Sequence, residues 1–398
     1  MDGAGEGTVR LLPGREKAAR AGHPWIFSGA VGRVAGDPAP GDVVRVEDAG
    51  GAFVARGFYS PGSRIRVRVV EAREDVGVDG FWWRDRLREA VARRRDLLAE
   101  PAGACRLVFS EADRLPGLVV DRYADRLAVQ VHTPGAERMR AETLAALREL
   151  LAPAAVLDRS DPEHRALEGL GPPPDGEAGG AGAPVEIAEA GLRFVANLAA
   201  GQKTGFYVDQ RLNRPAVAAW ARGRRVLDAF CYTGAFSVHA ARAGATSLTL
   251  VDSSQEALDL AARHLGLNGL DGVPTEVRRG NAFEELRRLR DAGRGFDLVV
   301  LDPPRLAPTR AQAQKAARAY KDVNLLGMKL LAPEGILATF SCSGGIEPAF
   351  FREIVRWAAQ DAGREVQVLE VLSQPPDHPV LLSFPESEYL KGLICRVL

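Results

Sequence analysis

The sequence contains few cysteines and no long apolar run. Its 398 residues include four cysteines, Cys105, Cys231, Cys342 and Cys395, and none of them forms a C-x-x-C pair. This spacing predicts neither a zinc site nor a disulfide framework. The apolar runs stay well below the roughly 18 residues of a membrane-spanning helix, and the first residues lack the apolar stretch of a signal peptide. We therefore expect a reduced, cytoplasmic protein that uses no metal and no membrane.

Neither sign of charge is in excess. The 52 Lys and Arg residues balance 52 Asp and Glu residues, and 46% of the chain is apolar, which is typical of globular proteins and excludes a disordered chain. Neutrality does not exclude a nucleic-acid partner, because a basic patch on one part can be balanced elsewhere. Residues 10–70 contain ten basic and five acidic residues, a local excess of +5. This excess fits either a solvated strand face or a small RNA-contacting barrel.

Three parts with different patterns follow one another along the chain. Residues 1–75 contain short alternating runs separated by glycine and proline, which predicts a small β-rich domain. Residues 76–185 mix strand-like runs with helical spacing over 81–99 and 136–151, which predicts a small α+β domain. Its last stretch, 169–184, is dense in glycine and proline and is expected to be a loop.

Residues 186–398 alternate between strand-like and helical runs. We expect strands at Arg225–Ala229, 247–251, Phe296–Leu301 and 335–340, and helices after residue 235 and over 254–265 and 310–331. This alternation predicts a doubly wound, largely parallel α/β sheet. In such sheets ligands bind at the carboxyl ends of the strands, so the residues just after each strand are candidates for a site.

The first of these strands and the turn after it have features of a cofactor site. The strand contains Asp228, and the turn carries one glycine, Gly234, before the next helix. The second strand ends at Asp252, which can accept hydrogen bonds from both hydroxyls of a ribose. A dinucleotide would need more glycines around its pyrophosphate, whereas S-adenosylmethionine (SAM) has no phosphate. An ordinary α/β turn is the alternative, and Ser253 with Glu256 is expected to form the capping box of the next helix.

The third and fourth strands are followed by groups that can carry a reaction. Asp302 ends one strand, with Pro303 and Pro304 fixing the backbone after it, and Cys342 follows the other. A thiolate that adds at C6 of a pyrimidine makes C5 enamine-like, so that C5 can take a methyl group from a sulfonium. Asp302 suits the proton needed at N3 of cytosine, and the base must be unpaired or flipped out. The structural alternatives are a rigid turn and a small buried cysteine.

With these motifs the chain resembles a known family over nearly its whole length. The motifs stand at residues 22–27 (GHPWIF), 111–118 (EADRLPGL), 203–211 (KTGFYVDQR), 232–234 (YTG), 302–304 (DPP), 340–344 (FSCSG), 377–379 (DHP), 385–386 (PE) and 389–392 (YLKG). Together they resemble the RlmI-type methyltransferases, which act on C5 of cytosine in large-subunit (23S) ribosomal RNA. The resemblance implies a class I SAM-dependent methyltransferase fold over 186–398, a middle domain over 76–185 and an RNA-binding PUA domain over 1–75.

The resemblance also implies roles for individual residues. Cys342 matches the nucleophile and Asp302 the acid that binds the base. The residues expected to bind SAM are Lys203, Thr204, Gly205, Phe206, Asp209, Asp228, Phe230, Tyr232, Thr233, Gly234, Asp252, Ser253, Asn281 and Asp302. Relatives often have an acid where this chain has Asn281, which leaves the role of that residue open.

The remaining roles concern the RNA. Arg211, Pro303, Pro304 and Arg305 are expected to contact it, and Lys203 or Arg211 could meet either the SAM carboxylate or a phosphate. RNA methyltransferases with a second cysteine beside the Asp-Pro motif use it for product release, but here prolines occupy that place. The proton-removing base is therefore unassigned, with Glu386 and His378 as candidates and a strand-end turn as the alternative. The expected partners are 23S rRNA, free or in an assembling subunit, and a second copy of the chain in a homodimer.

Two further interpretations stay open at this point. One is a SAM-dependent rRNA methyltransferase of another chemistry, at uracil C5 or guanine N7. The other is a non-catalytic RNA-binding assembly factor. Guanine methylation and an assembly role need no thiol, so Cys342 discriminates against both, whereas uracil C5 uses the same thiol chemistry.

Overall fold

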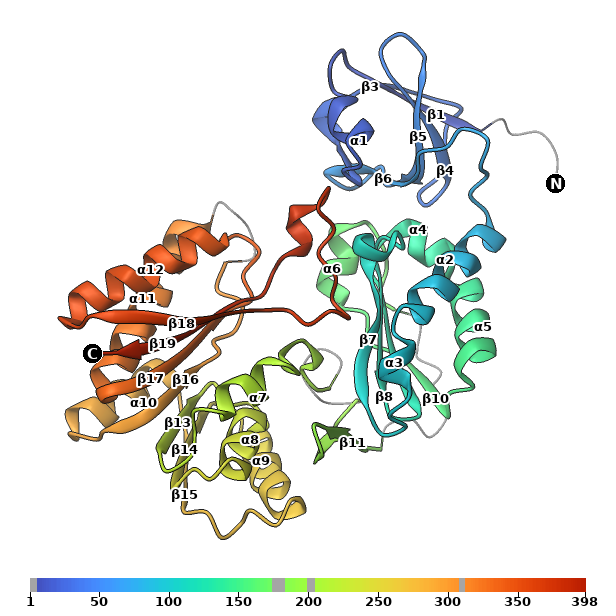
Figure 1. The fold of residues 1–398 in the computed structure, drawn as a ribbon. Coiled ribbons are helices and arrows are strands. Elements are labelled where there is room, and N and C mark those ends of the chain that lie inside the picture. The colour runs from blue at the N-terminus through green and yellow to red at the C-terminus, as the bar shows by residue number, and fades with distance from the viewer. Residues whose placement is uncertain (1–5, 174–182, 199–204, 308–311) are drawn as a thin grey trace. The chain divides into compact units, whose positions relative to one another are not determined.

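The computed structural model describes residues 6–173, 183–198, 205–307 and 312–398. Two compact units make up the chain, which Figure 1 colours from its N-terminus to its C-terminus. The first unit comprises Met1–Ile187, Ala196–Val208 and Pro376–Ser387, and the second comprises Ala188–Val195, Asp209–Pro375 and Glu388–Leu398. The chain therefore passes between the units five times.

A six-stranded sheet forms the N-terminal part of the first unit. Its order is β2-β6-β5-β4-β1-β3, with β1 and β4 parallel and the other neighbours antiparallel. Its elements are β1 (Gly7–Leu11), α1 (Lys17–Arg20), β2 (Trp25–Phe27), β3 (Val31–Ala35), β4 (Val43–Glu47), β5 (Phe53–Tyr59) and β6 (Ile65–Glu71). Alternate residues such as Val44 and Val46 are fully buried, as a half-exposed strand requires. The prediction of a small β-rich part is confirmed.

The rest of the first unit is built around a four-stranded sheet of order β10-β9-β8-β7. Its elements are α2 (Gly80–Ala92), α3 (Arg95–Leu98), β7 (Ala104–Phe109), the short 3-10 helix η2 (Ser110–Asp113), β8 (Leu118–Tyr123), β9 (Arg126–Val131), α4 (Pro134–Arg138), α5 (Arg140–Leu151), β10 (Ala155–Asp158) and α6 (Pro162–Leu167). The helix expected over 81–99 is thus two helices. One core joins this part to the N-terminal sheet, since Phe58 of β5 packs edge-on against Trp83 of α2, with ring centroids 5.7 Å apart.

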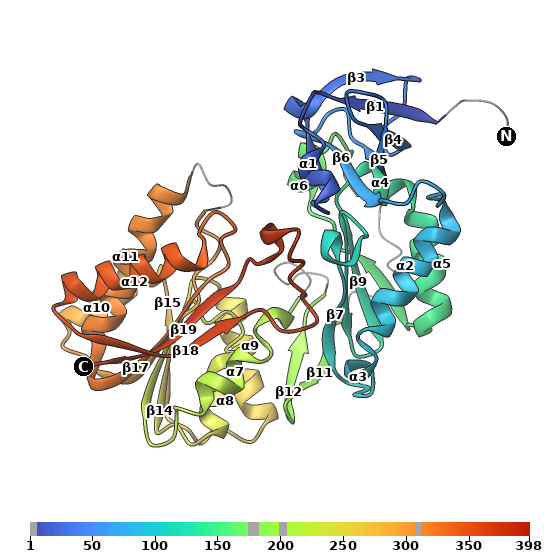
Figure 2. The same cartoon turned by 45° about the horizontal axis from the view of Figure 1, so that its top comes forward.

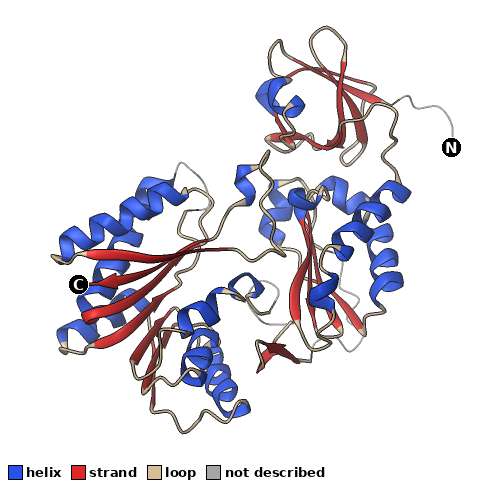
Figure 3. Ribbon diagram, in the orientation of Figure 1, coloured by secondary structure: helices blue, strands red, loops and turns tan. Residues whose placement is uncertain are grey.

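A seven-stranded sheet forms the second unit, in the order β15-β14-β13-β16-β17-β19-β18. The elements after β11 (Val185–Glu189) and β12 (Leu192–Ala196) are η3 (Val208–Gln210), α7 (Asn213–Ala218), β13 (Arg225–Ala229), α8 (Ala235–Arg242), β14 (Ser247–Asp252), α9 (Gln255–Leu267), β15 (Thr275–Arg279), α10 (Ala282–Asp291), β16 (Phe296–Leu301), α11 (Ala313–Leu330), β17 (Leu331–Ser341), α12 (Pro348–Ala362), β18 (Val366–Ser373) and β19 (Lys391–Val397). The short 3-10 helix η5 (Pro385–Ser387), between β18 and β19 in the chain, belongs to the first unit. Helices α10, α11 and α12 cover one face and α7, α8 and α9 the other (Figures 2 and 3). The predicted doubly wound sheet is confirmed.

The strand order places the ends of four strands at one edge. Strand β13 lies between β14 and β16 and is parallel to both, and β17 continues the parallel row. Helix α8, which follows β13, covers one face of the sheet, and helix α10, which precedes β16, covers the other. Ligands are expected beside the carboxyl end of β13, where the connections change face. Strand β19 runs antiparallel to β17 and pairs Lys391 with Ser341. That register brings the start of β19 to the same edge.

Candidate active site

Asp228 lies near the end of β13 and is 1% exposed. Its Oδ2 accepts hydrogen bonds from the Ser237 hydroxyl at 2.7 Å and from the Ser237 N–H at 3.2 Å, whereas its Oδ1 has no hydrogen-bond partner among the described residues. Burial raises the pKa of Asp228 to about 7, and the charges of Asp302 and Asp252 add to the rise. A buried oxygen without a donor beside two further carboxylates favours a cationic ligand. The ammonium and sulfonium of SAM meet this requirement.

The turn after β13 holds a strained backbone. Phe230, Tyr232 and Gly234 have φ angles of 63°, 49° and 70°, in the left-handed region. A Cβ at Gly234 would lie 2.6 Å from Cβ of Ala261 in α9, so only glycine fits there. Left-handed residues other than glycine cluster at ligand sites, where the surrounding structure holds them. The turn therefore has the conformation expected of a cofactor loop.

Asp252 supports this turn from the end of β14. Its Oδ2 accepts the Tyr232 N–H at 2.8 Å, and its Oδ1 accepts the Ser254 N–H at 3.0 Å. The expected capping box at Ser253 is wrong, because Ser254 is the N-cap of α9 and its hydroxyl accepts the Ala257 N–H at 3.2 Å. Since Asp252 binds the N–H of Ser254, the helix starts one residue later than expected. Ser253 is exposed.

Other expected cofactor residues take structural roles as well. The carbonyl of buried Thr233 accepts from Nδ1 of His264 at 2.9 Å, while Nε2 of His264 accepts the Val195 N–H at 2.8 Å. Burial lowers the pKa of His264 to about 4, so this bridge is neutral. Asn281 is the N-cap of α10, and its Oδ1 accepts the Phe283 N–H at 3.0 Å. Phe230 packs edge-on against the ring of Phe283 at 5.7 Å.

Asp302 follows β16 directly and is held by a residue that the sequence argument did not select. Its Oδ2 accepts the Gln210 side-chain amide at 3.1 Å, and Gln210, which is 2% exposed, accepts from the Asn213 amide at 2.6 Å. Asn213 also donates to the carbonyl of Ser373 at 3.1 Å. This chain of amides orients the carboxylate. Gln210 lies inside the 203–211 motif, which is the signal that could have identified it.

Cys342 differs from the other three cysteines. Cys105, Cys231 and Cys395 are buried, and burial raises the pKa of the Cys231 thiol well above its usual range and that of the Cys395 thiol to about 12. Cys342 is half-buried, just after β17. A thiol must be accessible and able to ionise in order to act as a nucleophile. The position of Cys342 meets the first condition.

Ser343 ties the cysteine to the Asp-Pro-Pro loop. Its hydroxyl oxygen accepts the N–H groups of Leu306 and Ala307 at 3.1 and 2.9 Å and lies 2.9 Å from the Tyr320 hydroxyl. Burial raises the pKa of Tyr320 to about 12, which keeps its hydroxyl neutral. Pro303 is buried in the same loop, whereas Pro304 and Arg305 are exposed. The residues after β16 and those after β17 thus form one bonded group.

Lys391 supplies the charge beside the thiol, and sequence reasoning did not select it. The register with Ser341 places it at the start of β19, where it is 5% exposed. Its ammonium donates to the carbonyls of Ser343 and Tyr389, both at 2.7 Å. Burial lowers the pKa of Lys391 to about 8, and the neighbouring Cys342 acts in the opposite direction. A buried ammonium next to a thiol stabilises its thiolate form.

The segment before the cofactor fold is divided between the units. Gly205 and Phe206 belong to the first unit, where the Phe206 carbonyl accepts the Tyr123 hydroxyl at 2.8 Å. Asp209 and Arg211 belong to the second, where Asp209 accepts the Tyr389 hydroxyl at 2.7 Å. Lys203 and Thr204 lie outside the described residues. The roles expected of these residues stay predictions.

The two candidate bases belong to the first unit. Glu386 lies 3.4 Å from Nε2 of His23, and His378 is 1% exposed with its ring centroid 5.4 Å from that of Phe109. Their catalytic role stays a prediction. Across the described ranges no group of three or more His, Cys, Asp and Glu side chains could hold a metal ion, and no helix is long and apolar enough to cross a membrane.

Comparison with known proteins gives the family. A model described as an S-adenosylmethionine-dependent methyltransferase matches residues 122–396, and one described as a PUA-like domain matches residues 9–71. The ribosomal RNA large subunit methyltransferase I of Aeromonas hydrophila is 44% identical over 98% of this chain and 99% of its own length. This chain belongs to that family. The protein of the same name from Tolumonas auensis is 43% identical over the same shares.

Solved structures show the same fold. A putative SAM-dependent methyltransferase from Streptococcus mutans superposes with a TM-score of 0.82 over 98% of this chain and 100% of its own, at 20% identity. A putative methyltransferase complexed with SAH gives 0.83 over the same shares, also at 20% identity. The protein is thus a SAM-dependent methyltransferase with an N-terminal PUA-like domain. The unsatisfied oxygen of Asp228 and the tight turn at Gly234 fit its cofactor.

Proposed function

We propose that this methyltransferase acts on C5 of a cytosine in large-subunit (23S) ribosomal RNA, through a covalent bond between Cys342 and C6. The names of the relatives support the substrate. The half-buried thiol after β17 carries the chemical part, because Lys391 lies beside it and Ser343 joins it to the loop of Asp302. Guanine N7 methylation would not use this arrangement, since guanine N7 is already nucleophilic.

The proposed reaction begins with the thiolate of Cys342. The sulfur bonds to C6, the C5–C6 double bond supplies electrons that make C5 nucleophilic, and Asp302 provides a proton at N3. Bound SAM supplies the methyl group as an electrophile. Gln210 keeps the carboxyl group of Asp302 oriented toward the base. Lys391 stabilises the thiolate before attack and again when it leaves.

Release of the product needs a base that removes the C5 proton. As that proton leaves, the C5–C6 double bond reforms, the thiolate is expelled and the N3 proton returns to Asp302, so a methyl group replaces the proton at C5. Glu386 and His378 remain our candidates. Loss of turnover with accumulation of an RNA–protein adduct in Glu386→Gln or His378→Gln, but not in both, would assign the base. Normal turnover in both variants, with no RNA–protein adduct in either, would remove both candidates.

The other residues take supporting roles in this proposal. Residues 1–75 act as an RNA-binding PUA domain, 76–185 as a middle domain and 186–398 as the methyltransferase domain. SAM contacts the turn and strand ends that include Asp228 and Asp252, and Arg211 and Arg305 approach the RNA. The enzyme works in the cytoplasm, where ribosomal RNA is assembled, and a homodimer is the expected state. Sedimentation velocity at micromolar concentration tests the dimer, which a single monomeric boundary would refute.

The decisive experiment is methyl transfer from labelled SAM to unmodified large-subunit rRNA, by wild type and Cys342→Ala, followed by nucleoside analysis. Label in 5-methylcytidine that is lost in the variant is the expected result. Label in 5-methyluridine with the same loss would keep the thiol mechanism and change the base. Label in another nucleoside with an active variant would refute the role of Cys342. No label on free rRNA or on precursor particles would favour an assembly factor.

A further inference from the structure

Three sequence motifs that lie apart from Cys342 and Asp302 in the sequence meet in the first unit. They are residues 22–27, 111–118 and the segment 376–387, which we call the C-terminal strap. Trp25 donates through Nε1 to Glu111 at 2.9 Å, and its ring lies 4.7 Å from that of Phe384. Asp377 of the strap accepts the Arg106 N–H at 3.0 Å through its carboxylate. The strap is therefore a bonded part of this unit.

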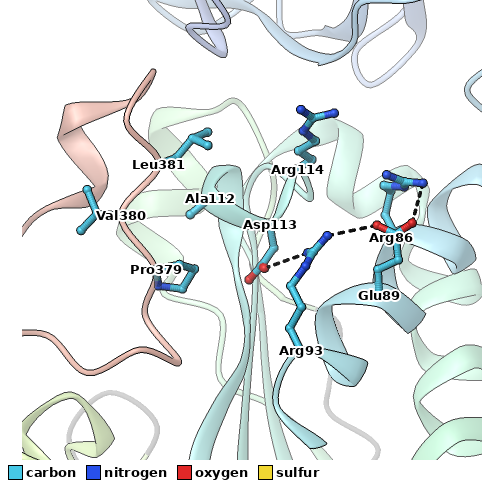
Figure 4. Close-up of a pocket in the computed structure, with 9 residues that line it drawn as sticks. All are labelled: Arg86, Glu89, Arg93, Ala112, Asp113, Arg114, Pro379, Val380 and Leu381. Carbon is cyan, nitrogen blue, oxygen red and sulfur yellow. Dashed lines mark hydrogen bonds and ion pairs between the residues drawn. The ribbon is translucent and has the colours of Figure 1, made fainter.

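A cavity of about 460 Å³ opens between the strap, α2 and the residues at η2 (Figure 4). Its two sides differ in chemistry. One side carries the guanidinium groups of Arg86, Arg93 and Arg114, and the other is apolar and includes Pro379 and Leu381. Such a cavity suits a ligand with an anionic part and an apolar, planar part.

Arg114 is the cation available to a ligand. Arg86 and Arg93 share the carboxylate of Glu89 at 2.8 and 3.1 Å. Arg114 is exposed and makes no side-chain hydrogen bond or ion pair with the described residues, and Figure 4 shows it with no dashed line to the other lining residues. Asp113, its neighbour, is already paired with the buried Arg94 at 2.7 and 2.8 Å. The positive charge of Arg114 is therefore uncompensated at the cavity.

The backbone holds Arg114 in this place at some cost. Its φ of 61° lies in the left-handed region, which favours glycine and asparagine. The turn is fixed because Asp113 accepts the Phe109 N–H at 2.7 Å and Arg94 also donates to the carbonyl of Asp377 at 2.9 Å. A non-glycine residue kept in a strained conformation by surrounding bonds is a common feature of ligand sites.

We propose that this cavity binds a nucleotide of the RNA substrate, with its phosphodiester on Arg114 and its base on the apolar side formed by Pro379 and Leu381. The inference rests on the proposed function only in taking RNA as the substrate. The size of the cavity, the uncompensated guanidinium and the adjoining apolar wall match one nucleotide. In this proposal Arg114 of the 111–118 motif and Pro379 of the 377–379 motif serve RNA recognition.

The test measures RNA binding without SAM, so its outcome does not depend on which base is methylated. In-vitro-transcribed 23S rRNA is bound by full-length wild type, Arg114→Asn and Arg114→Lys in filter assays across a salt series. Asparagine tolerates the left-handed backbone, and thermal unfolding checks that it does. Arg95→Asn is the matched control, because Arg95 is 84% exposed, lies near α2 and does not line the cavity.

We expect Arg114→Asn to weaken binding roughly 5- to 10-fold and to reduce the slope of log Kd against log salt by about one, as loss of one phosphate contact does. We expect Arg114→Lys to leave the slope of log Kd against log salt unchanged. We expect Leu381→Ser to weaken RNA binding without changing that slope. Equal losses in Arg114→Asn and Arg95→Asn would overturn the proposal, because they would indicate a long-range charge effect. An unchanged affinity for RNA in Arg114→Asn would overturn it too, and so would a loss seen only with ribosomal particles, which would indicate a protein partner.

Discussion

Replacing Asp228 with asparagine is expected to make the SAM-free protein more stable while weakening its cofactor binding. Burial raises the pKa of Asp228 from 3.8 to about 7. At about 1.4 kcal/mol for each tenfold change in the ionisation constant, the ionised carboxylate costs about 4 kcal/mol of unfolding free energy. Asparagine keeps an oxygen for the Ser237 hydroxyl and carries no charge. We expect Asp228→Asn to gain about 2–4 kcal/mol at pH 8.

The pH dependence gives this prediction its sign. At pH values below the usual pKa of 3.8, Asp228 is neutral in both the folded and the unfolded chain, so its burial does not lower the unfolding free energy there. Between pH 4 and 7 the unfolded chain ionises first, so the unfolding free energy of wild type falls as pH rises, and the loss is complete above about pH 7. Urea unfolding at pH 5, 6, 7 and 8 measures this contribution. The difference between Asp228→Asn and wild type should grow over that range.

SAM binding should also be linked to the ionisation of Asp228. The positive groups of SAM favour the ionised form, so binding at pH 6 releases up to one proton from Asp228. Titration calorimetry in two buffers of different ionisation enthalpy measures that proton, and Asp228→Asn should not release it. The SAM affinity of the variant should fall at least tenfold if, as we propose, the Asp228 carboxylate binds a positive group of SAM, because asparagine removes that charge.

A second aspartate in the same sheet is the control. Asp297, at the start of β16, is bonded to Arg225, which lowers the pKa of Asp297. Asp297→Asn should therefore be neutral or slightly destabilising at pH 8, with SAM affinity unchanged. If Asp228→Asn is no more stable than wild type at pH 8, the argument from burial is refuted. If it binds SAM as tightly as wild type, Asp228 is not a cofactor contact.

Substitutions at three further positions test the site and its support. Lys391→Met should lower methyl transfer at least tenfold at pH 7.5. Lys391→Arg should retain activity above pH 8, whereas the activity of wild type should decline there because the Lys391 amine, with a pKa of about 8, loses its proton. Identical pH–rate profiles of wild type and Lys391→Arg would contradict this prediction. Gly234→Ala should cost about 2 kcal/mol in urea unfolding and weaken SAM binding in calorimetry, because its Cβ would lie 2.6 Å from that of Ala261 at a φ of 70°; normal stability and affinity would show that the turn can move. Glu189→Gln should lower the free energy of unfolding by about 3–5 kcal/mol in chemical denaturation, because it removes the carboxylate that pairs with Arg214 at 2.6 Å, where both side chains are 3% exposed. A loss below 1 kcal/mol would mean that Arg214 finds another partner.

Local pattern predicted the second unit well. The strand bounds 225–229 and 296–301 are confirmed, because a buried strand needs a continuous apolar run bounded by polar residues. Asp302 and Cys342 could be placed at one edge from the sequence because parallel strands end on the same side. Chemistry at strand ends is thus readable from a single chain when the strands alternate with helices.

The parts that escaped prediction depend on pairing between distant segments. Lys391 lies beside the cysteine only through the antiparallel register of β19 with β17, which no local pattern encodes. Gln210 meets Asp302 across 92 positions of sequence. The error at Ser253 has a similar origin, since Asp252 takes the N–H of Ser254 and moves the helix start by one residue. In each case a hydrogen bond or strand pairing made in the folded state decided the outcome.

The path of the chain between the units bears on how the protein is made. A growing polypeptide leaves the ribosome from its N-terminus, and N-terminal domains commonly finish folding while the rest is still being synthesised. The first unit cannot complete its packing in this way, because residues 376–387 belong to it and are translated after residues 209–375 of the second unit. Until then Trp25 lacks the ring of Phe384 and Arg94 lacks the carbonyl of Asp377. The unit that includes the PUA-like domain is therefore completed only after every strand of the methyltransferase sheet except β19 has been translated.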